Sequence, residues 1–489
     1  MKRINKKQAG SALAYGLIIM AIVSIILVSM LQYISSQIKF SFSRGEREEA
    51  FQIAESGVYF YRWYLAHEVS GKTASQIKDF WKNGSPYGVA SDYEAEFFDP
   101  EGGALGKYSI HVQPPDPDST IVVVKSTGWT YKEPSIKRVV QARFRRPSWS
   151  EYAVMANDVM RFGPGTQIYG KVQSNDGVRF DGVAHNIVSS SMDKYDDPDH
   201  SGAVEFGVHT HVNTPPGSGV TDTFRAAEAP PSALTTRTDV FQAGRQFPVP
   251  TIDFNGVISD LNNMKIAAQT SGQGLYFDNA GGGRRLILKS DGSFDMCIVN
   301  TYDSASYAIS KYNKISGGGT CNSCSGACLK NYPIPNKGVI FVENNIWVEG
   351  SINNARIAIV AANLIGGTKA NIYIGNDNLL YTNFDGKDII GLIGQQNISV
   401  IQNSLDSLTI DAALLAQSGR VGRDYYGGSH KNSITVNGSI ATNLRYGFAY
   451  TDGTGYNART LNFDNNLLYF PPPYFPTGTE YSIDLWDEL

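Results

Sequence analysis

The stretch KKQAGSALAYGLIIMAIVSIILVSMLQYISSQIKF, residues 6–40, decides how this chain begins. No charge occurs from Gln8 to Ile38. As a helix, the apolar run 12–34 would be roughly 35 Å long, which is enough to span the hydrocarbon core of a bilayer. A secretory signal peptide has a shorter apolar core, about 7–15 residues. The run therefore predicts a membrane-spanning helix that is retained.

The basic residues Lys2, Arg3, Lys6 and Lys7 all precede this run. The excess of positive charge on the cytoplasmic side of membrane helices predicts a cytoplasmic N-terminus. Everything after Ile38 is then expected outside the cell, with the chain crossing the cytoplasmic membrane once.

Helical periodicity continues beyond the apolar run. Small or apolar residues recur at i, i+3 and i+4 spacing, and the first proline after this pattern is Pro86. The residues on this stripe are Ala50, Ile53, Ala54, Gly57, Val58, Tyr61 and Leu65. We expect one helix from about Ser11 to about Glu68, on the order of 90 Å long.

Two segments resemble the N-terminal region of PilX-type minor pilins of type IV pili. They are GSALAYGLIIMAIVSIIL, residues 10–27, and AFQIAESGVYFYR, residues 50–62. In that family a prepilin peptidase cuts after a glycine, and the apolar helix serves as a membrane anchor and then as filament core. The resemblance implies that Gly10 ends the leader and Ser11 begins the mature chain. It also implies the peptidase, the membrane and other pilins as partners. A plain single-pass anchor is the alternative.

One position departs from the family pattern. Many pilins carry a glutamate at the fifth mature position, where this chain has Tyr15. By resemblance, that glutamate neutralises the terminal amine of a neighbouring subunit in an apolar setting, where an unpaired charge is costly. Its absence implies a subunit at the filament tip.

Composition indicates an exported β-rich protein of two or three domains. The chain has 489 residues, a net charge of −4, 18% charged residues, 49 glycines and 27 tyrosines. The charge gives no indication of nucleic-acid binding, and we expect no cofactor.

Four runs rich in β-branched and aromatic residues occupy the region from 91 to 146. They predict an antiparallel sheet packed on the amphipathic half of the long helix, and strands KSTGW and KRVVQARFRR resemble a pair in PilX-type proteins. The expected division is a leader at 1–10, a helix at 11–69, a sheet at 70–147, a solenoid at 148–450 and a C-terminal cap at 451–489.

The solenoid is expected from short recurring patterns. The motif Gly-Lys/Ser-Val/Ile occurs at Gly170, Gly350 and Gly438, and a small residue precedes a polar one at Ala362, Gly394, Ala416 and Ala441. Spacings of roughly 20–30 residues with Gly and Asn at corners are typical of β-solenoids. We expect a right-handed parallel β-helix, mainly β with the one long N-terminal α-helix, and keep a β-sandwich as the alternative.

An insertion at about 186–335 is expected to interrupt the solenoid. It contains a helical pattern at Ile258, Leu261, Met264 and Ala267, which Asp253 or Asn255 could cap and Gly272 could end. This helix is expected to pack on one flank of the solenoid.

All four cysteines, Cys297, Cys321, Cys324 and Cys328, lie in this insertion. Outside the membrane, an even number of clustered cysteines predicts two disulfides, and four cysteines allow three pairings. A zinc site is one alternative, because the spacing Cys-x2-Cys-x3-Cys also suits metal ligation, and free thiols are the other.

Two weaker candidates are a carboxylate loop and a histidine pair. Asp193, Asp196, Asp197 and Asp199 offer the hard oxygen ligands that Ca²⁺ prefers, although the spacing does not match an EF-hand. His209 and His211 face the same side of a predicted strand. Without an identifiable third ligand, we interpret them as a surface pair.

No catalytic pattern is assembled. The single Asp-Asp pair, Asp196-Asp197, stands without the companions that β-helical polysaccharide hydrolases use, and no P-loop or Gly-x-Ser-x-Gly elbow occurs. The sequence predicts a non-enzymatic minor pilin-like protein that displays a β-helical domain for adhesion, with a surface glycan as a candidate partner, or for filament initiation. The alternative is a membrane-anchored surface protein that binds or acts on polysaccharide.

Overall fold

The computed structural model describes residues 8–69, 72, 74–115, 119–252, 254, 260–478 and 481–489. The chain folds as two compact units. Unit 1 comprises Met1–Pro115, Ile121–Arg145 and Thr479–Leu489, and unit 2 comprises Asp116–Thr120 and Arg146–Gly478. Each unit has its own hydrophobic core. Lys2, Arg3, Lys6 and Lys7, which carry the expected orientation, lie outside the described residues.

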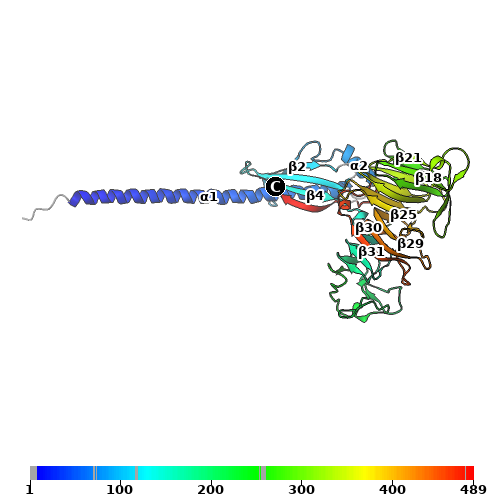
Figure 1. Cartoon of the computed structure of the whole chain (residues 1–489). Coiled ribbons are helices and arrows are strands. Elements are labelled where there is room, and N and C mark those ends of the chain that lie inside the picture. Colours follow the sequence, from blue (N-terminus) through cyan, green and yellow to red (C-terminus); the bar gives the residue numbers. More distant parts are fainter. Residues whose placement is uncertain are drawn as a thin grey trace, which may run out of the picture. The chain divides into compact units, whose positions relative to one another are not determined.

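Unit 1 combines the long helix with one antiparallel sheet (Figure 1). Helix α1 runs from Gln8 to Val69, as the continuous periodicity predicts, and a short helix α2, Ala74–Asn83, follows. In the described part of this unit the sheet has the order β1-β2-β3-β4-β32. These strands are Tyr93–Phe98, Ala104–Gln113, Ile121–Thr130, Lys137–Arg145 and Ser482–Glu488.

The second half of α1 packs on this sheet through the predicted stripe. Ile53, Val58 and Leu65 are buried against strand residues that include Val124 and Phe144. Alternate residues of β3 point into the core, as expected for a sheet with one covered face. Gly128 allows the close approach of the helix, because a Cβ there would lie 2.3 Å from the backbone nitrogen of Ala54.

The end of the chain does not form the expected cap. Residues 482–488 form β32, which pairs antiparallel with β4 and so completes the sheet of unit 1. The Arg143 guanidinium donates to the Asp484 carboxylate (Nε–Oδ1 2.9 Å) across this pair. The sequence pattern of 482–488 indicates a strand but not the partner strand, which lies more than 330 positions earlier.

Unit 2 is built mainly from parallel strand pairs that join successive turns of the chain. The ladder we call A contains β15, β11, β8, β5, the end of β30, the end of β28, β26, β24, β22 and β16, in that spatial order. These strands are Arg245–Gln246, Val188–Ser190, Val172–Ser174, Val154–Ala156, His430–Thr442, Ser407–Ala416, Ile389–Gly394, Arg356–Ala361, Gly338–Val342 and Gly274–Phe277.

Two further ladders run beside ladder A. Ladder B joins β17, β23, β25, β27 and β29, which are Gly283–Leu288, Ile346–Ile352, Ile372–Tyr381, Ile398–Val400 and Val421–Arg423. Ladder C joins the ends of β23 and β25, the starts of β28 and β30, then β31, β7 and β10, of which the last three are Gly455–Phe463, Thr166–Tyr169 and Val183–Ala184. Aliphatic side chains from all three ladders fill one core.

The remaining strands of unit 2 form smaller pairings. Met160–Phe162 (β6), Val178–Phe180 (β9) and Val208–His209 (β14) are parallel, whereas Lys194–Tyr195 (β12) and Glu205–Phe206 (β13) are antiparallel. Ser293–Tyr302 (β18), Ile309–Asn313 (β19), Thr320–Cys321 (β20) and Lys330–Pro333 (β21) extend β17 as an antiparallel group.

The order of strands in the ladders is not the order of the sequence. Ile440 of β30 pairs with Val154 of β5, and Leu461 of β31 pairs with Ile168 of β7. The first turns of unit 2 therefore stack on its last ones (β30 and β31 are labelled in Figure 1). The start and the middle of the expected insertion also belong to ladders, since β11, β16 and β17 fall within 186–335.

The expected repeat register is correct in its middle and shifted by one residue at its ends. Gly394 pairs with Ala416, as the pattern predicts. The partners beyond them are Ala361 and Thr442, rather than Ala362 and Ala441. A shift of one residue exchanges the two faces of a strand, and here both faces of ladder A are buried, so the sequence pattern does not distinguish them.

Asparagines at one corner act through hydrogen bonds. The backbone nitrogen of Asn371 donates to Asn345 Oδ1 (2.9 Å), and that of Asn397 donates to Asn371 Oδ1 (3.1 Å). None of these three has a positive φ, whereas Asn354, at the corner between β23 and β24, has a φ of 52°. The amide oxygens of the three instead satisfy the corner backbone of the next turn.

Helix α3, Asp260–Gln269, covers the outer face of ladder A, as the predicted flank position requires. Leu261, Met264 and Ala267 pack with Phe341 and Val360. The proposed caps Asp253 and Asn255, and Ile258 of the periodic pattern, lie outside the described residues. Gly272 follows the helix with a positive φ of 80°, which suits the turn that ends it.

Candidate functional site

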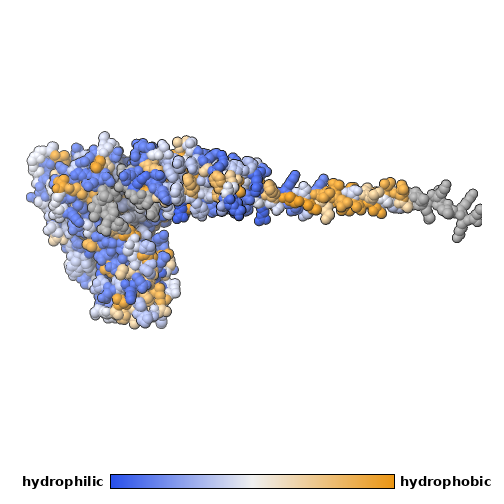
Figure 2. Space-filling view, turned by 180° about the vertical axis from the view of Figure 1, so that it is seen from behind, coloured by the Kyte–Doolittle hydropathy of each residue, from blue (hydrophilic) through white to orange (hydrophobic). Residues whose placement is uncertain are grey.

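The first half of α1 is an apolar surface with no cover in the structure. Every side chain from residue 12 to residue 42 is exposed, including Leu17, Ile25 and Leu31 (Figure 2). By length and composition α1 could cross a membrane. An apolar helix surface of this length needs lipid or other helices around it.

The predicted processing residues lie at the start of this helix. Gly10 and Ser11 are helical, but their side chains are not among those described. Tyr15 is 66% exposed, on the part of α1 that is exposed throughout residues 12–42. Cleavage after Gly10 stays a prediction.

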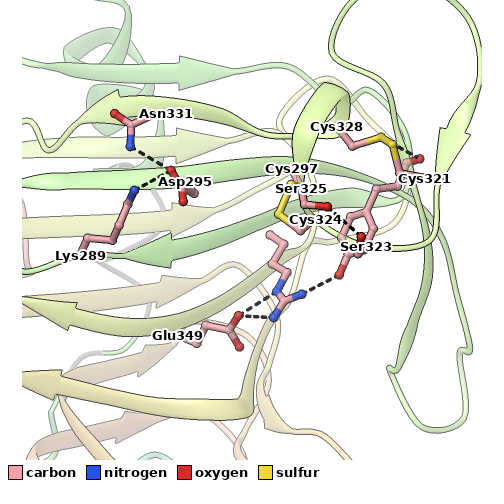
Figure 3. Close-up of a disulfide and its surroundings, with 12 residues drawn as sticks. Lys289, Asp295, Cys297, Cys321, Ser323, Cys324, Ser325, Cys328, Asn331 and Glu349 are labelled. Atoms are coloured by element: carbon pink, nitrogen blue, oxygen red, sulfur yellow. Dashed lines mark hydrogen bonds and ion pairs between the residues drawn. A yellow bond between two sulfur atoms is a disulfide. The ribbon is translucent and has the colours of Figure 1, made fainter.

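The four cysteines form two disulfides (Figure 3). Cys297 of β18 pairs with Cys324, and Cys321 of β20 pairs with Cys328, so all four thiols are used. Cys297 and Cys328 are fully buried beside Trp347 and Tyr373, which stand on the outer face of ladder B. The disulfides therefore tie β18, β20 and the turn after β20 to one another within the antiparallel group. The sequence had left the pairing open among three possibilities.

The four carboxylates of the predicted Ca²⁺ loop are not brought together. Asp193 and Asp196 are exposed, and Asp199 is bound by Arg445 (Nη1–Oδ1 3.0 Å) and Arg161 (3.3 Å). Asp197 alone turns inward and is buried. The expected all-oxygen site is thus replaced by an aspartate that joins a different set of side chains.

The structure gathers a buried histidine–carboxylate cluster around Asp197. Its members are Asp197, His200, Glu205, His209 and His211, and each offers one ligand atom within 4.8 Å of all the others. The side chains are between 0% and 4% exposed. His209 and His211 face the same side, as their spacing predicts, but the expectation of a surface pair is wrong because both are fully buried.

Short strands place these residues. Glu205 begins β13, which pairs with β12, and His209 ends β14, which pairs with β9. Asp197 and His200 come from the turn that joins β12 to β13. The sequence contained one signal for the cluster, the alternation in VHTHV, but the other three residues follow no ligand spacing.

Glu205 is the centre of the cluster. Its Oε2 lies 3.0 Å from His200 Nε2 and 3.1 Å from His209 Nε2, and its Oε1 lies 3.2 Å from His211 Nε2. Asp197 Oδ2 lies 3.5 Å from both His200 Nε2 and His209 Nε2. Three imidazoles and two carboxylates therefore converge on one small volume.

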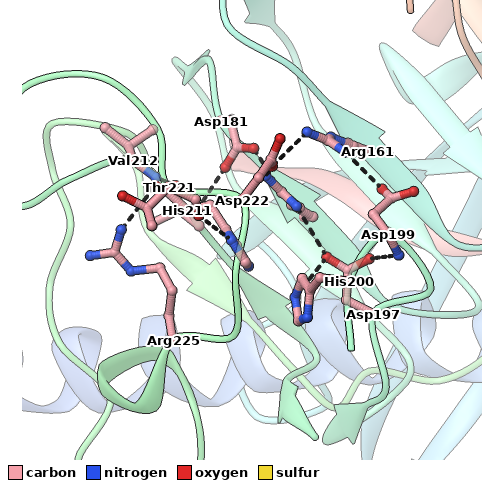
Figure 4. A network of polar contacts seen from close by, with 12 residues as sticks. Arg161, Asp181, Asp197, Asp199, His200, His211, Val212, Thr221, Asp222 and Arg225 are labelled. Carbon is pink, nitrogen blue, oxygen red and sulfur yellow. Dashed lines mark hydrogen bonds and ion pairs between the residues drawn. The ribbon is translucent and has the colours of Figure 1, made fainter. Parts of the chain in front are cut away.

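An outer layer of groups holds these side chains in place. The Thr221 carbonyl accepts from His211 Nδ1 (2.8 Å), the backbone nitrogen of Asp199 donates to Asp197 Oδ1 (3.0 Å), and that of Arg225 donates to Glu205 Oε1 (2.9 Å). Figure 4 shows these surroundings of Asp197, His200 and His211. Such outer contacts fix ring orientation and tautomer at metal sites.

Electrostatics keep both carboxylates ionised despite their burial. Burial opposes ionisation of Asp197, but the adjacent His209, the backbone amide of Asp199 and the Arg179 guanidinium lower its pKa well below the usual range. Burial likewise opposes ionisation of Glu205, while His211, His209 and the Arg225 amide lower its pKa. The cluster thus presents two buried carboxylates, and one buried cation, the Arg179 guanidinium, lies beside it with Nη1 3.6 Å from Asp197 Oδ2.

Comparisons with known proteins give little direct guidance. No protein-family model and no curated protein sequence matches the chain. Among solved structures, the chain is similar to the competence-associated pilin ComZ from Thermus thermophilus, at 14% identity and a TM-score of 0.28, covering 91% of this chain and 97% of that chain. At these values the similarity carries no argument, so function is argued from the residues.

Proposed function

We propose that this chain is a minor pilin-like structural protein of a type IV pilus or related filament. Its helix α1 anchors it once in the cytoplasmic membrane with the rest outside, and after processing the helix joins other pilins in an extracellular filament. The role is assembly and display rather than catalysis. The peptidase, the other pilins and the membrane are its partners.

The observation that carries the proposal is the division of α1 into two halves. The helix is continuous from Gln8 to Val69, yet it is exposed over residues 12–42, with the apolar run at 12–34, and buried on one stripe from Ala50 onward. The buried half holds the antiparallel sheet of unit 1. The exposed half is then free to exchange lipid for the helices of neighbouring subunits, which is what a filament subunit requires.

The tip position and the displayed domain complete the proposal. Tyr15 replaces the glutamate that bulk pilins use, and unit 2, mainly residues 146–478, is a large addition for a subunit repeated along a thin filament. We propose that ladders A, B and C form a right-handed parallel β-helix. Its turns would present tyrosine and asparagine side chains for adhesion, with a surface glycan as a candidate ligand.

N-terminal processing tests the assignment. Sequencing of filament or membrane fractions should begin at Ser11, and Gly10→Val should leave the full-length chain in the membrane. Gly16→Val is the matched control, since a Cβ at Gly16 meets nothing within 4 Å, and it should be processed normally. An intact Met1 in assembled filaments would reject the pilin function and leave a plain anchor.

Immunogold labelling of unit 2 tests the position along the filament. We expect label at filament ends only, and fewer filaments when the gene is deleted. Tyr15→Glu should allow some copies into the shaft, because it supplies the missing partner for a terminal amine. Dense label along wild-type shafts would remove the tip model while leaving the pilin assignment in place.

A further inference from the structure

We propose that Asp197, His200, Glu205, His209 and His211 bind one divalent transition-metal ion, with Zn²⁺ as the best fit. The site lies within unit 2 and is independent of the proposed filament function. It also differs from the sequence expectation of no cofactor and of calcium at neighbouring aspartates.

The separations between ligand atoms suit a metal at their centre. In a four- or five-coordinate zinc site, bonds of about 2.0–2.2 Å place neighbouring ligand atoms about 2.8–3.8 Å apart. In the cluster, His211 Nε2 and Glu205 Oε2 are 3.4 Å apart, and Asp197 Oδ2 is 3.5 Å from His200 Nε2 and from His209 Nε2. The contacts of Glu205 with His200 and His209 are slightly shorter, at 3.0 and 3.1 Å.

The position of the proton on the His211 ring indicates a cation between His211 Nε2 and Glu205. Its Nδ1 lies 2.8 Å from the Thr221 carbonyl, which can only accept, so Nδ1 carries the proton. A neutral His211 then turns the lone pair of Nε2 toward Glu205 Oε1, 3.2 Å away. Two acceptors in contact repel each other unless a cation lies between them or the ring takes a second proton.

His209 and Asp197 lead to the same inference. Three buried atoms make no hydrogen bond with any described residue: both ring nitrogens of His209 and Oδ2 of Asp197. His209 Nε2 lies near two carboxylate oxygens without hydrogen-bond geometry. Leaving such atoms unpaired costs about 1–3 kcal/mol each or more when charged, whereas a metal would satisfy them together.

The chemistry of the ligands selects the class of ion. Three imidazole nitrogens favour zinc, copper, iron or nickel over calcium, which takes oxygen ligands. The two negative charges of the carboxylates balance the charge of a divalent ion. Because the five side chains are at most 4% exposed, no coordination position opens to solvent, which is typical of structural rather than catalytic zinc.

A structural ion has a clear task here. The residues between β11 and β15 contain only two-residue strands, so few backbone pairings hold them. Asp197 and His200 come from the turn before β13, Glu205 from β13 itself, and His209 and His211 from the end of β14 and the residues after it. One ion would therefore connect the turn 196–204, β13 and β14, and its binding free energy would contribute to folding.

Metal analysis of the untagged full-length chain in detergent tests the proposal. After loading with Zn²⁺ and removal of free ions, we expect about one zinc per chain. His209→Ala and His211→Ala should each retain less than about one fifth of that amount. His430→Ala is the matched control, because His430 is exposed on β30, and it should keep the full amount.

A second measurement covers the case in which the variants fail to fold. Chelation of wild-type protein should lower the thermal midpoint by about 5 °C or more, and added Zn²⁺ should restore it. Co²⁺ loading should give the visible absorption bands of a four- or five-coordinate nitrogen–oxygen site. Wild-type protein that holds no stoichiometric zinc, cobalt, nickel, manganese, iron or copper after loading, with a midpoint unaffected by chelator, would overturn the proposal in favour of a protonated histidine network. Full metal content in both histidine variants would also overturn it.

Discussion

Two regions of unit 2 are held together in different ways. The ladder segment, residues 338–442, stacks parallel strands and fills the space between them with aliphatic side chains such as Ile359, Leu392 and Leu414. The ionic segment, residues 191–245, has strands of two residues and buries charged groups instead, including Glu205, Glu228 and Arg237.

The difference teaches how each kind of interior fails. Apolar burial is spread over many similar contacts, so loss of one side chain removes a limited share. Buried charges depend on specific partners, and removal of one partner leaves the other desolvated and unpaired. The two segments should therefore respond differently to single and paired substitutions.

The largest effect is expected in the ionic segment, from Arg245→Met. Arg245 is bound to the buried Glu228, and its guanidinium also donates to the Val208 carbonyl (3.0 Å). Its loss should reduce the free energy of unfolding by about 3–5 kcal/mol, because among the described residues the Glu228 carboxylate then keeps one more distant cationic partner, Arg237, at 3.9 Å. Denaturant unfolding of the detergent-solubilised chain measures this.

The paired variant sharpens the comparison. Arg245→Met with Glu228→Met removes both charges, so it should be less destabilising than Arg245→Met alone. A double variant whose loss equals the sum of the two single losses would show that the ionic segment behaves like the ladder segment.

In the ladder segment, Leu414→Ala should cost about 3 kcal/mol, since it removes a fully buried side chain from a core that relaxes only in part. Leu444→Ala is the control, because Leu444 is 46% exposed and should change stability little. The same unfolding measurement applies. An equal effect of the two substitutions would contradict the assigned core.

Asn371→Ala should have a smaller effect, about 1–2 kcal/mol, because Asn397 loses the acceptor for its partly buried corner amide. Amide exchange at Asn397 should also become faster. Asn322→Ala, at an exposed position of the disulfide-bonded loop, should change neither quantity. Unchanged exchange at Asn397 in the first variant would remove the hydrogen-bond role of the corner asparagines.

The smallest effect is a pH dependence at Asp464, which follows β31. Burial raises the pKa of this carboxyl, although hydrogen bonds from Asn466 lower it in part. A raised pKa in the folded state contributes stability below the unfolded pKa of about 3.9, and that stability is lost as pH rises through the folded pKa. The free energy of unfolding of Asp464→Asn, relative to that of wild type, should therefore increase as pH rises from about 4 to neutrality. A difference in unfolding free energy that stays constant over this range would reject the assignment.

Much of unit 1 could be predicted from sequence because its signals are local. The stripe from Ala50 to Leu65 marks the buried face of α1, and the alternating strands mark the sheet that covers it. In unit 2 the repeats indicate strands that stack, and the VHTHV alternation indicates two side chains on one side. The signal weakens where both faces of a strand are buried, as in ladder A, which explains the one-residue shift at Ala361 and Thr442.

The sequence by itself determined the long helix with its two halves, the strand-rich remainder and the clustering of the cysteines, since each depends on residues that are near neighbours in the chain. Only the tertiary structure decided that β5 stacks on β30, that β32 returns to the sheet of unit 1 and that Asp197 and Glu205 meet three histidines. A residue pattern fixes which face of an element is buried, but it does not name the distant element that covers that face. Buried polar sites are the hardest to predict, because their residues are close in space but follow no regular spacing in the sequence.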